Sequence, residues 1–208
     1  IDTGPAIVRS DNKQYLKNMV NSGILIGRAQ LDYHITPKEN HHLMFTGGIL
    51  EDMFSGVGME YLYFKPNTNY SFGIEAFKVK KRDYNWKFGH LDYENTLVNA
   101  KFYYRNYGLI PFDMKFSFGE YLAGDVGSTI EFSRTFNGGV QFGIWASLTD
   151  VSTEQFGEGS FDKGIFFKIP IYNGLFDYRW RPLTKDPAAP LLRKHTLHDL
   201  LVKFRPLN

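Results

Sequence analysis

Four carboxylates in one glycine-rich stretch have the residue types that could do chemistry: Asp150, Glu154, Glu158 and Asp162. Carboxylates on a loop can bind calcium or act as the acid/base pair of a glycosidase. Their spacing matches no calcium-binding loop, and the flanking glycines are typical of turns. We therefore expect solvated loop carboxylates here and no catalytic residue.

The histidines make a weak case for a metal site. His195 and His198 are three apart and would share one face of a helix, yet no third ligand follows nearby. His41 and His42 are adjacent, so on a strand they point to opposite faces. The chain has no nucleophile elbow, phosphate-binding loop or dinucleotide fingerprint, and Gly124-Asp125 is typical of a turn. We expect no enzymatic activity, no metal and no cofactor.

Composition excludes further classes of protein. The 208 residues carry a net charge of +2 with dispersed Lys and Arg, so we expect no nucleic-acid partner. No apolar run approaches the ~20 residues of a membrane helix. Cysteine is absent, which favours folding in an oxidising compartment but also occurs in cytosolic proteins. The chain starts at Ile1 without a Met, so we expect a mature product or a piece of a longer protein.

The elements that must position these residues are strands. Between Pro111 and Ile171, apolar residues alternate with polar or small ones. The apolar positions are Phe112, Met114, Phe116, Phe118, Ile130, Phe132, Val140, Phe142, Ile144, Ala146 and Leu148. A period of two predicts three adjacent strands with one apolar and one polar face. Similar patterns predict five strands before these three, two after them near 164–171 and 176–183, and an eleventh from Thr196 to Pro206.

The first residues follow a different period. Ser10 and Asp11 can cap a helix whose apolar side is Tyr15, Leu16, Met19 and Val20, and Gly23 can end it. We therefore expect a short helix in an N-terminal segment, residues 1–23, followed by a β domain, residues 24–208.

The connections between strands favour a membrane barrel. Residues 66–69, 106–110, 137–139 and 172–175 are short connections, whereas 81–92, 150–163 and 184–195 are longer and more charged, with 121–127 as the shorter exception. Consecutive connections of an up-and-down sheet lie at opposite ends, and this asymmetry is typical of outer-membrane barrels. We expect an all-β, antiparallel, up-and-down transmembrane β-barrel of about 10–12 strands. A soluble sandwich or closed barrel remains the alternative, because periodicity does not say which way the apolar face points.

Several strings in this pattern resemble the YjbH family. The longest is GEYLAGDVGST at residues 119–129, followed by LTDV at 148–151 and FGEGSFDKG at 156–164; GMEYLY at 58–63, VKKRDY at 79–84 and RPLTKD at 181–186 are similar too. The resemblance implies an outer-membrane β-barrel protein of Gram-negative bacteria, often a lipoprotein, linked to exopolysaccharide or group 4 capsule production and export. Family members are usually much longer, so it implies their C-terminal barrel region.

Three hypotheses follow for function. The barrel contacts extracellular polysaccharide in its lumen; or it anchors export partners, or the rest of its own chain, in outer-membrane lipid; or, with least support, it is an outer-membrane hydrolase. The candidate glycan contacts are Tyr121, Glu120, Glu131, Arg134 and Trp145. The candidate residues of a loop that folds over the barrel mouth are Phe156, Glu158, Phe161 and Asp162. Pore and anchor differ in whether the charges of the lumen pair with one another and plug it.

Overall fold

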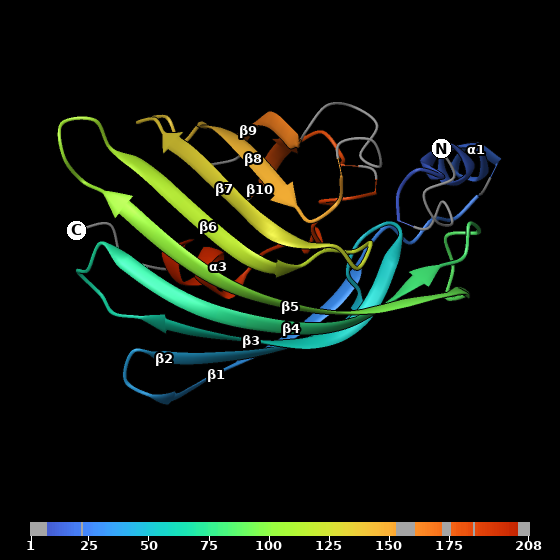
Figure 1. The fold of residues 1–208 in the computed structure, drawn as a ribbon, viewed down its shortest axis with the longest axis horizontal. Helices are drawn as coiled ribbons and strands as arrows, with labels where there is room; N and C mark the ends of the chain where they lie inside the picture. Colours follow the sequence, from blue (N-terminus) through green and yellow to red (C-terminus); the bar gives the residue numbers. More distant parts are fainter. Residues whose placement is uncertain (1–7, 22, 153–160, 172–175, 185, 204–208) are drawn as a thin grey trace.

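The chain forms one antiparallel sheet of ten strands, each hydrogen-bonded to the next in sequence (Figure 1). The computed structural model describes residues 8–21, 23–152, 161–171, 176–184 and 186–203. The strands are β1 (Ala29–Lys38), β2 (His41–Ile49), β3 (Phe54–Phe64), β4 (Tyr70–Arg82), β5 (His90–Asn106), β6 (Phe112–Glu120), β7 (Val126–Thr135), β8 (Gln141–Thr149), β9 (Asp162–Ile171) and β10 (Phe176–Trp180). The helices are α1 (Asn12–Asn21) and α3 (Leu197–Lys203).

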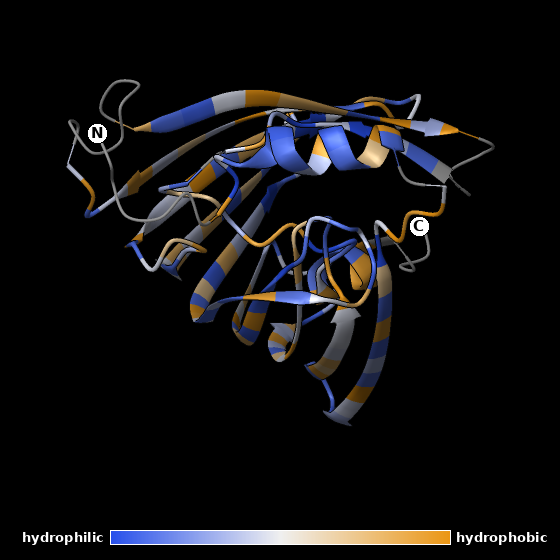
Figure 2. Cartoon of the chain, turned by 90° about the vertical axis from the view of Figure 1, so that its right-hand side faces the viewer, coloured by the Kyte–Doolittle hydropathy of each residue, from blue (hydrophilic) through white to orange (hydrophobic). Residues whose placement is uncertain are grey.

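The two faces of the sheet differ in polarity, which appears as alternating bands along the strands in Figure 2. Cross-strand partners share a face, and Phe132 pairs with Ile144, which pairs in turn with Ile165. One position along, Lys115 pairs with Glu131, which pairs with Trp145. The first set is exposed, whereas Glu131 and Trp145 of the second set contact Arg181, which follows β10. Because the chain after β10 lies on the concave side of the sheet in Figure 1, the polar face is the concave one. The predicted alternation is therefore confirmed, and the apolar face points outward.

The all-β, up-and-down order is confirmed, but closure into a barrel is not observed. Within the described residues, no backbone pairing joins β1 to β10. Neither of the two described helices has the length and apolar composition to cross a bilayer.

The eleventh strand predicted from Thr196 to Pro206 is wrong, because helix α3 occupies Leu197–Lys203. A capping box explains the error. The Asp199 backbone amide donates to Thr196 Oγ1 at 3.1 Å, and the Thr196 amide donates to Asp199 Oδ2 at 2.9 Å. This reciprocal pair satisfies amides that a helix start leaves free. This capping box favours a helix over the strand that the pattern of apolar residues had indicated.

The predicted N-terminal helix is present as α1, at the end of the sheet that carries the longer connections (Figure 1). Tyr15 is buried there, its hydroxyl donates to the Arg82 carbonyl, and its own carbonyl accepts from Trp86 Nε1 at 2.9 Å. The first strand begins at Ala29 rather than near Ile24, because the Ile26 amide donates to the Trp86 carbonyl instead of a neighbouring strand.

Candidate functional site

The concave side of the sheet is occupied by the chain's own residues 186–203, which we call the inner segment (Figures 1 and 2). After β10 the chain turns back and runs along the inward faces of β1–β5. It ends in α3, which contacts β2 and β3. The contacts of this segment define the chemistry of the interior.

A buried ionic network holds the middle of the inner segment. The Arg193 guanidinium donates to Glu60 on β3 at 2.9 Å and to Glu75 on β4, and Lys101 on β5 lies 2.6 Å from Glu75. The side chains of Arg193 and Glu60 are only 3% and 2% exposed. Charges removed from water in this way are tolerated only when they are paired and hydrogen-bonded. Two inward carboxylates thus depend on two cations, one of them from the inner segment.

Further polar bonds extend the network along the segment. The Leu197 backbone amide donates to Glu60 at 3.0 Å, and His195 Nε2 lies 2.8 Å from the Asp32 carboxylate on β1. Asp32 also accepts from Thr46 at 2.7 Å. The inner segment is therefore bonded to successive strands through side chains that point inward.

Helix α3 adds an apolar and aromatic contact. Leu197 is fully buried with Met44, Leu62 and Tyr103. The His198 ring stacks on Tyr103 with a centroid distance of 3.8 Å. Burial in this contact, together with the nearby cations Lys115, Arg105 and Lys101, lowers the pKa of His198 to about 4, although Asp199 acts in the opposite direction. His198 is therefore neutral at physiological pH.

We expect acidification to weaken the packing of α3. Above pH 6.5, His198 is neutral in both the folded and unfolded states; between pH 6.5 and about 4, only the unfolded state takes up the proton. The free energy of unfolding should fall across this window and show no further loss from this residue below it. Urea unfolding at pH 7 and pH 5 checks this, with His198→Gln as the variant expected to show a flatter pH dependence. An equal slope in the variant would rule out His198 as the source.

The start of the inner segment is tied to the N-terminal residues and to two turns. The Arg9 guanidinium donates to both carboxylate oxygens of Glu51, at 2.7 and 2.8 Å. The Leu192 backbone amide also donates to Glu51, at 2.7 Å, and the Arg9 backbone amide donates to Asp186 at 3.0 Å. Asp125 accepts from the Ala188 amide at 2.7 Å, and burial raises the pKa of Asp125. The long-connection end of the sheet is thus held together by carboxylates that accept from backbone.

Three of the candidate glycan contacts already have partners within the chain. The Trp145 indole donates to Asp162 at 2.9 Å, and the Arg181 guanidinium lies 4.0 Å from the centre of its ring. Arg181 also donates to Glu131 at 2.8 Å. Tyr121 is 4% exposed and its hydroxyl bonds to Thr129. These side chains serve the interior packing, and the ring face of Trp145 is covered by Arg181.

The other two candidate glycan contacts lie apart from these. Glu120 ends β6 at the long-connection end, beside its pairing partner Val126. Arg134 lies near the opposite end of β7, with its guanidinium 5.2 Å from the centre of the Phe136 ring. The alternation of the strands places both on the outward face. The structure therefore does not bring the five candidates together into one site.

The candidate gate residues are divided between the two faces. Phe156 and Glu158 lie outside the described residues. Phe161 borders a shallow hollow with Phe116, Ile130 and Leu148, residues of the outward face, and the Lys163 ammonium lies 4.4 Å from the centre of its ring. Asp162 points inward, where it accepts from Trp145 and, at 2.7 Å, from the Thr184 hydroxyl. The gate remains a prediction.

Residues 3–203 match the family described as exopolysaccharide biosynthesis protein YbjH. The chain belongs to the YjbH family. It is 33% identical over 207 residues to a protein of Escherichia coli K12 described as an uncharacterized lipoprotein YjbH. The match covers 93% of this chain and 28% of that relative, so the chain spans little more than a quarter of the relative's length. No solved structure matches the chain.

The family-like string GEYLAGDVGST surrounds a turn with a structural role. The Gly124 amide donates to the Tyr121 carbonyl at 3.0 Å, and the φ of Gly124 is 84°. Such a φ favours glycine. The predicted turn at Gly124-Asp125 is therefore present, and Asp125 also receives the Ala188 amide. Sequence reasoning missed this bond and the role of Arg193, because their partners are distant in sequence.

Proposed function

We propose that this YjbH-family chain forms a membrane-embedded β-barrel sector of the bacterial outer membrane that serves exopolysaccharide biosynthesis as an anchor whose interior is closed. The two parts of this proposal, membrane residence and a closed interior, have separate support. The inner segment that occupies the concave side supports the closed interior, and it favours an anchor over an open pore.

The convex side supports membrane residence. Large apolar side chains lie exposed on it along most strands, among them Leu31, Phe45, Val57, Met59, Phe72, Ile74, Val98, Phe116, Phe118, Ile130, Phe132, Phe142, Ile144, Ile165 and Ile169. Monomeric soluble proteins rarely expose contiguous apolar patches of more than roughly a few hundred Å², whereas the exposed apolar side chains of this face lie on every strand from β1 to β9. Lipid is the environment in which such a face is stable, and outer-membrane barrels show this outward apolar and inward polar pattern.

The ionic network supports a closed interior. An open pore needs charges that face water, whereas Glu60, Glu75, Lys101 and Arg193 are paired with one another. The inner segment that supplies Arg193 also occupies the concave side through His195 and α3. An anchor for partners, or for the remaining length of a longer protein, fits this filling better than free conduction does.

The proposal requires partners for the sheet edges. In a bilayer an unpaired strand edge leaves backbone groups without water or hydrogen bonds. Arg28, just before β1, donates to the Leu192 carbonyl at 2.9 Å, and Arg179 on β10 donates to the Lys194 carbonyl at 3.2 Å. One side chain beside each edge is therefore bonded to the inner segment, while the outer backbone edges of β1 and β10 have no strand partner among the described residues. We propose that β1 and β10 complete the barrel through each other or through further strands of a longer protein.

We expect two results in the bacterium that encodes the protein. The protein should sediment with outer-membrane vesicles, resist carbonate extraction and require detergent for release, because its convex face is apolar. Deletion of the gene should lower exopolysaccharide output, and plasmid-borne wild type should restore it. Recovery of the folded protein in plain buffer would overturn membrane residence, and unchanged exopolysaccharide in the deletion strain would overturn the role.

A further inference from the structure

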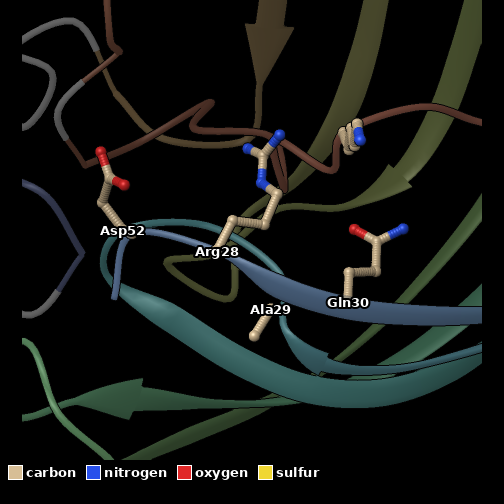
Figure 3. A pocket seen from close by; sticks show the side chains of 6 residues that line it. Arg28, Ala29, Gln30 and Asp52 are labelled. Carbon is tan, nitrogen blue, oxygen red and sulfur yellow. The ribbon is translucent and has the colours of Figure 1, made fainter. Parts of the chain in front are cut away.

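A polar pocket lies where the beginning of β1, the turn between β2 and β3, and the inner segment meet (Figure 3). Its volume is about 620 Å³, and its lining residues are Gly27, Arg28, Ala29, Gln30, Asp52 and Lys194. This volume falls within the range of roughly 300–1,000 Å³ that small-molecule sites occupy. In Figure 3 the side chains of Arg28, Gln30 and Asp52 rise from the chain on the same side, toward the inner segment.

The pocket presents hydrogen-bond donors with positive charge. Arg28 has one hydrogen bond within the described part of the chain, from Nη2 to the Leu192 carbonyl at 2.9 Å. A guanidinium has five N–H donors, so most of those of Arg28 remain available. No described residue forms an ion pair with the Lys194 ammonium. Two cations can therefore act on a ligand in this space.

The same pocket presents acceptors. Gln30 Nε2 donates to both oxygens of Asp32 at 2.8 and 2.9 Å, which fixes the orientation of its amide. The opposite atom, Gln30 Oε1, is buried and has no partner among the described residues. Since a buried carbonyl oxygen without a hydrogen bond is unfavourable, this atom calls for a donor. The Asp52 carboxylate adds further acceptors; it lies near enough to Arg28 for the two charges to attract each other, but they form no direct salt bridge within the described ranges.

The combination of cationic donors and acceptors in this pocket indicates the chemical class of its ligand. A small anion without hydroxyl groups, such as sulfate, would satisfy Arg28 and Lys194 but would offer no hydrogen-bond donor to Asp52 or to Gln30 Oε1. A ligand with hydroxyl groups and a carboxylate satisfies both sets, because its hydroxyls donate to Gln30 and Asp52 while its carboxylate accepts from the cations. We propose that this pocket binds a carboxylate-bearing sugar unit of an acidic polysaccharide. The inference rests on the proposed role in exopolysaccharide biosynthesis and names the class of glycan.

Calorimetric titration of the full protein in detergent tests the inference. The acidic probe is tetragalacturonate and the matched neutral probe is maltotetraose. We expect binding of the acidic probe alone, weakened about 10-fold or more by Arg28→Gln and by Lys194→Gln, since each removes a charged hydrogen bond. The control variant is Lys163→Gln, whose ammonium lies beside Phe161 and away from the pocket; it should bind as wild type does.

Four outcomes would overturn the inference. Equal binding of maltotetraose would reject the acidic class, and competition by sodium sulfate at equal concentration would indicate a simple anion site. Absence of tetragalacturonate binding, or equal binding by both pocket variants, would reject the pocket itself. The pocket and the proposed function can fail independently. If the deletion strain loses exopolysaccharide but the purified protein does not bind tetragalacturonate, only the pocket inference is rejected.

Discussion

Replacing Arg193 with Met should lower the free energy of unfolding by about 3–5 kcal/mol, the range observed when one partner of a buried ion pair is removed. Met retains much of the length and the apolar stem of Arg, so the loss is mainly one of charge and hydrogen bonds. Glu60 would then be left without its cation in a site where its side chain is 2% exposed. Urea unfolding of the detergent-solubilised protein measures the change.

The control for this prediction is Lys17→Met on α1, which removes an exposed positive charge and should change stability by less than ~0.5 kcal/mol. The double variant Arg193→Met with Glu60→Gln should lose less than the sum of the two single losses, because the stranded charge is gone. Additive losses would contradict a direct Arg193–Glu60 interaction. In the single variant Arg193→Met, residues 186–203 should also be more accessible to protease than in the wild-type protein.

A charge on the convex face should be the second large perturbation. Ile144 lies midway along β8, is 49% exposed, and pairs with Phe132 and Ile165 on the same face. Ile144→Arg should cost about 2–4 kcal/mol if this position is near the midplane of a bilayer. Folding into lipid vesicles, followed by urea titration, measures the cost.

The matched control for the convex face is Ile144→Leu, which keeps the position apolar and should cost less than ~1.5 kcal/mol. If Ile144→Arg folds as well as Ile144→Leu in vesicles, lipid does not cover this face. Measuring both variants in detergent as well as in vesicles separates the cost of burying a charge in lipid from a defect in side-chain packing. A packing defect should appear in both media, whereas the cost of the charge should appear in vesicles.

The strands and their faces could be predicted because they depend on local alternation. Phe112–Leu148 follows a period of two, and the structure has β6, β7 and β8 there. The end of the chain could not be predicted by the same rule. Residues from Thr196 onward alternate weakly, and the capping box formed by Thr196 and Asp199 is the signal that identifies α3.

The site was less accessible to sequence reasoning. An inward polar face with Glu60, Glu75 and Lys101 follows from alternation, but the cation that completes it is 133 residues after Glu60. Nothing local to Arg193 indicates that partner. Trp145 and Glu131 have the chemistry of glycan contacts, yet Arg181 engages both. The identity of a side chain therefore did not reveal whether it was available to a ligand.

The inner segment also has a consequence for the order of folding. Its bonds join residues far apart in the chain, with separations of 118 for Arg193 to Glu75, 163 for His195 to Asp32 and 177 for Arg9 to Asp186. The strands, by contrast, pair with their immediate neighbours. Closing long loops is entropically costly, and neighbouring hairpins avoid that cost. The sheet should therefore assemble first, with Glu60, Glu75 and Asp32 still hydrated. The inner segment should pack onto the concave side in a late step and displace water from these carboxylates.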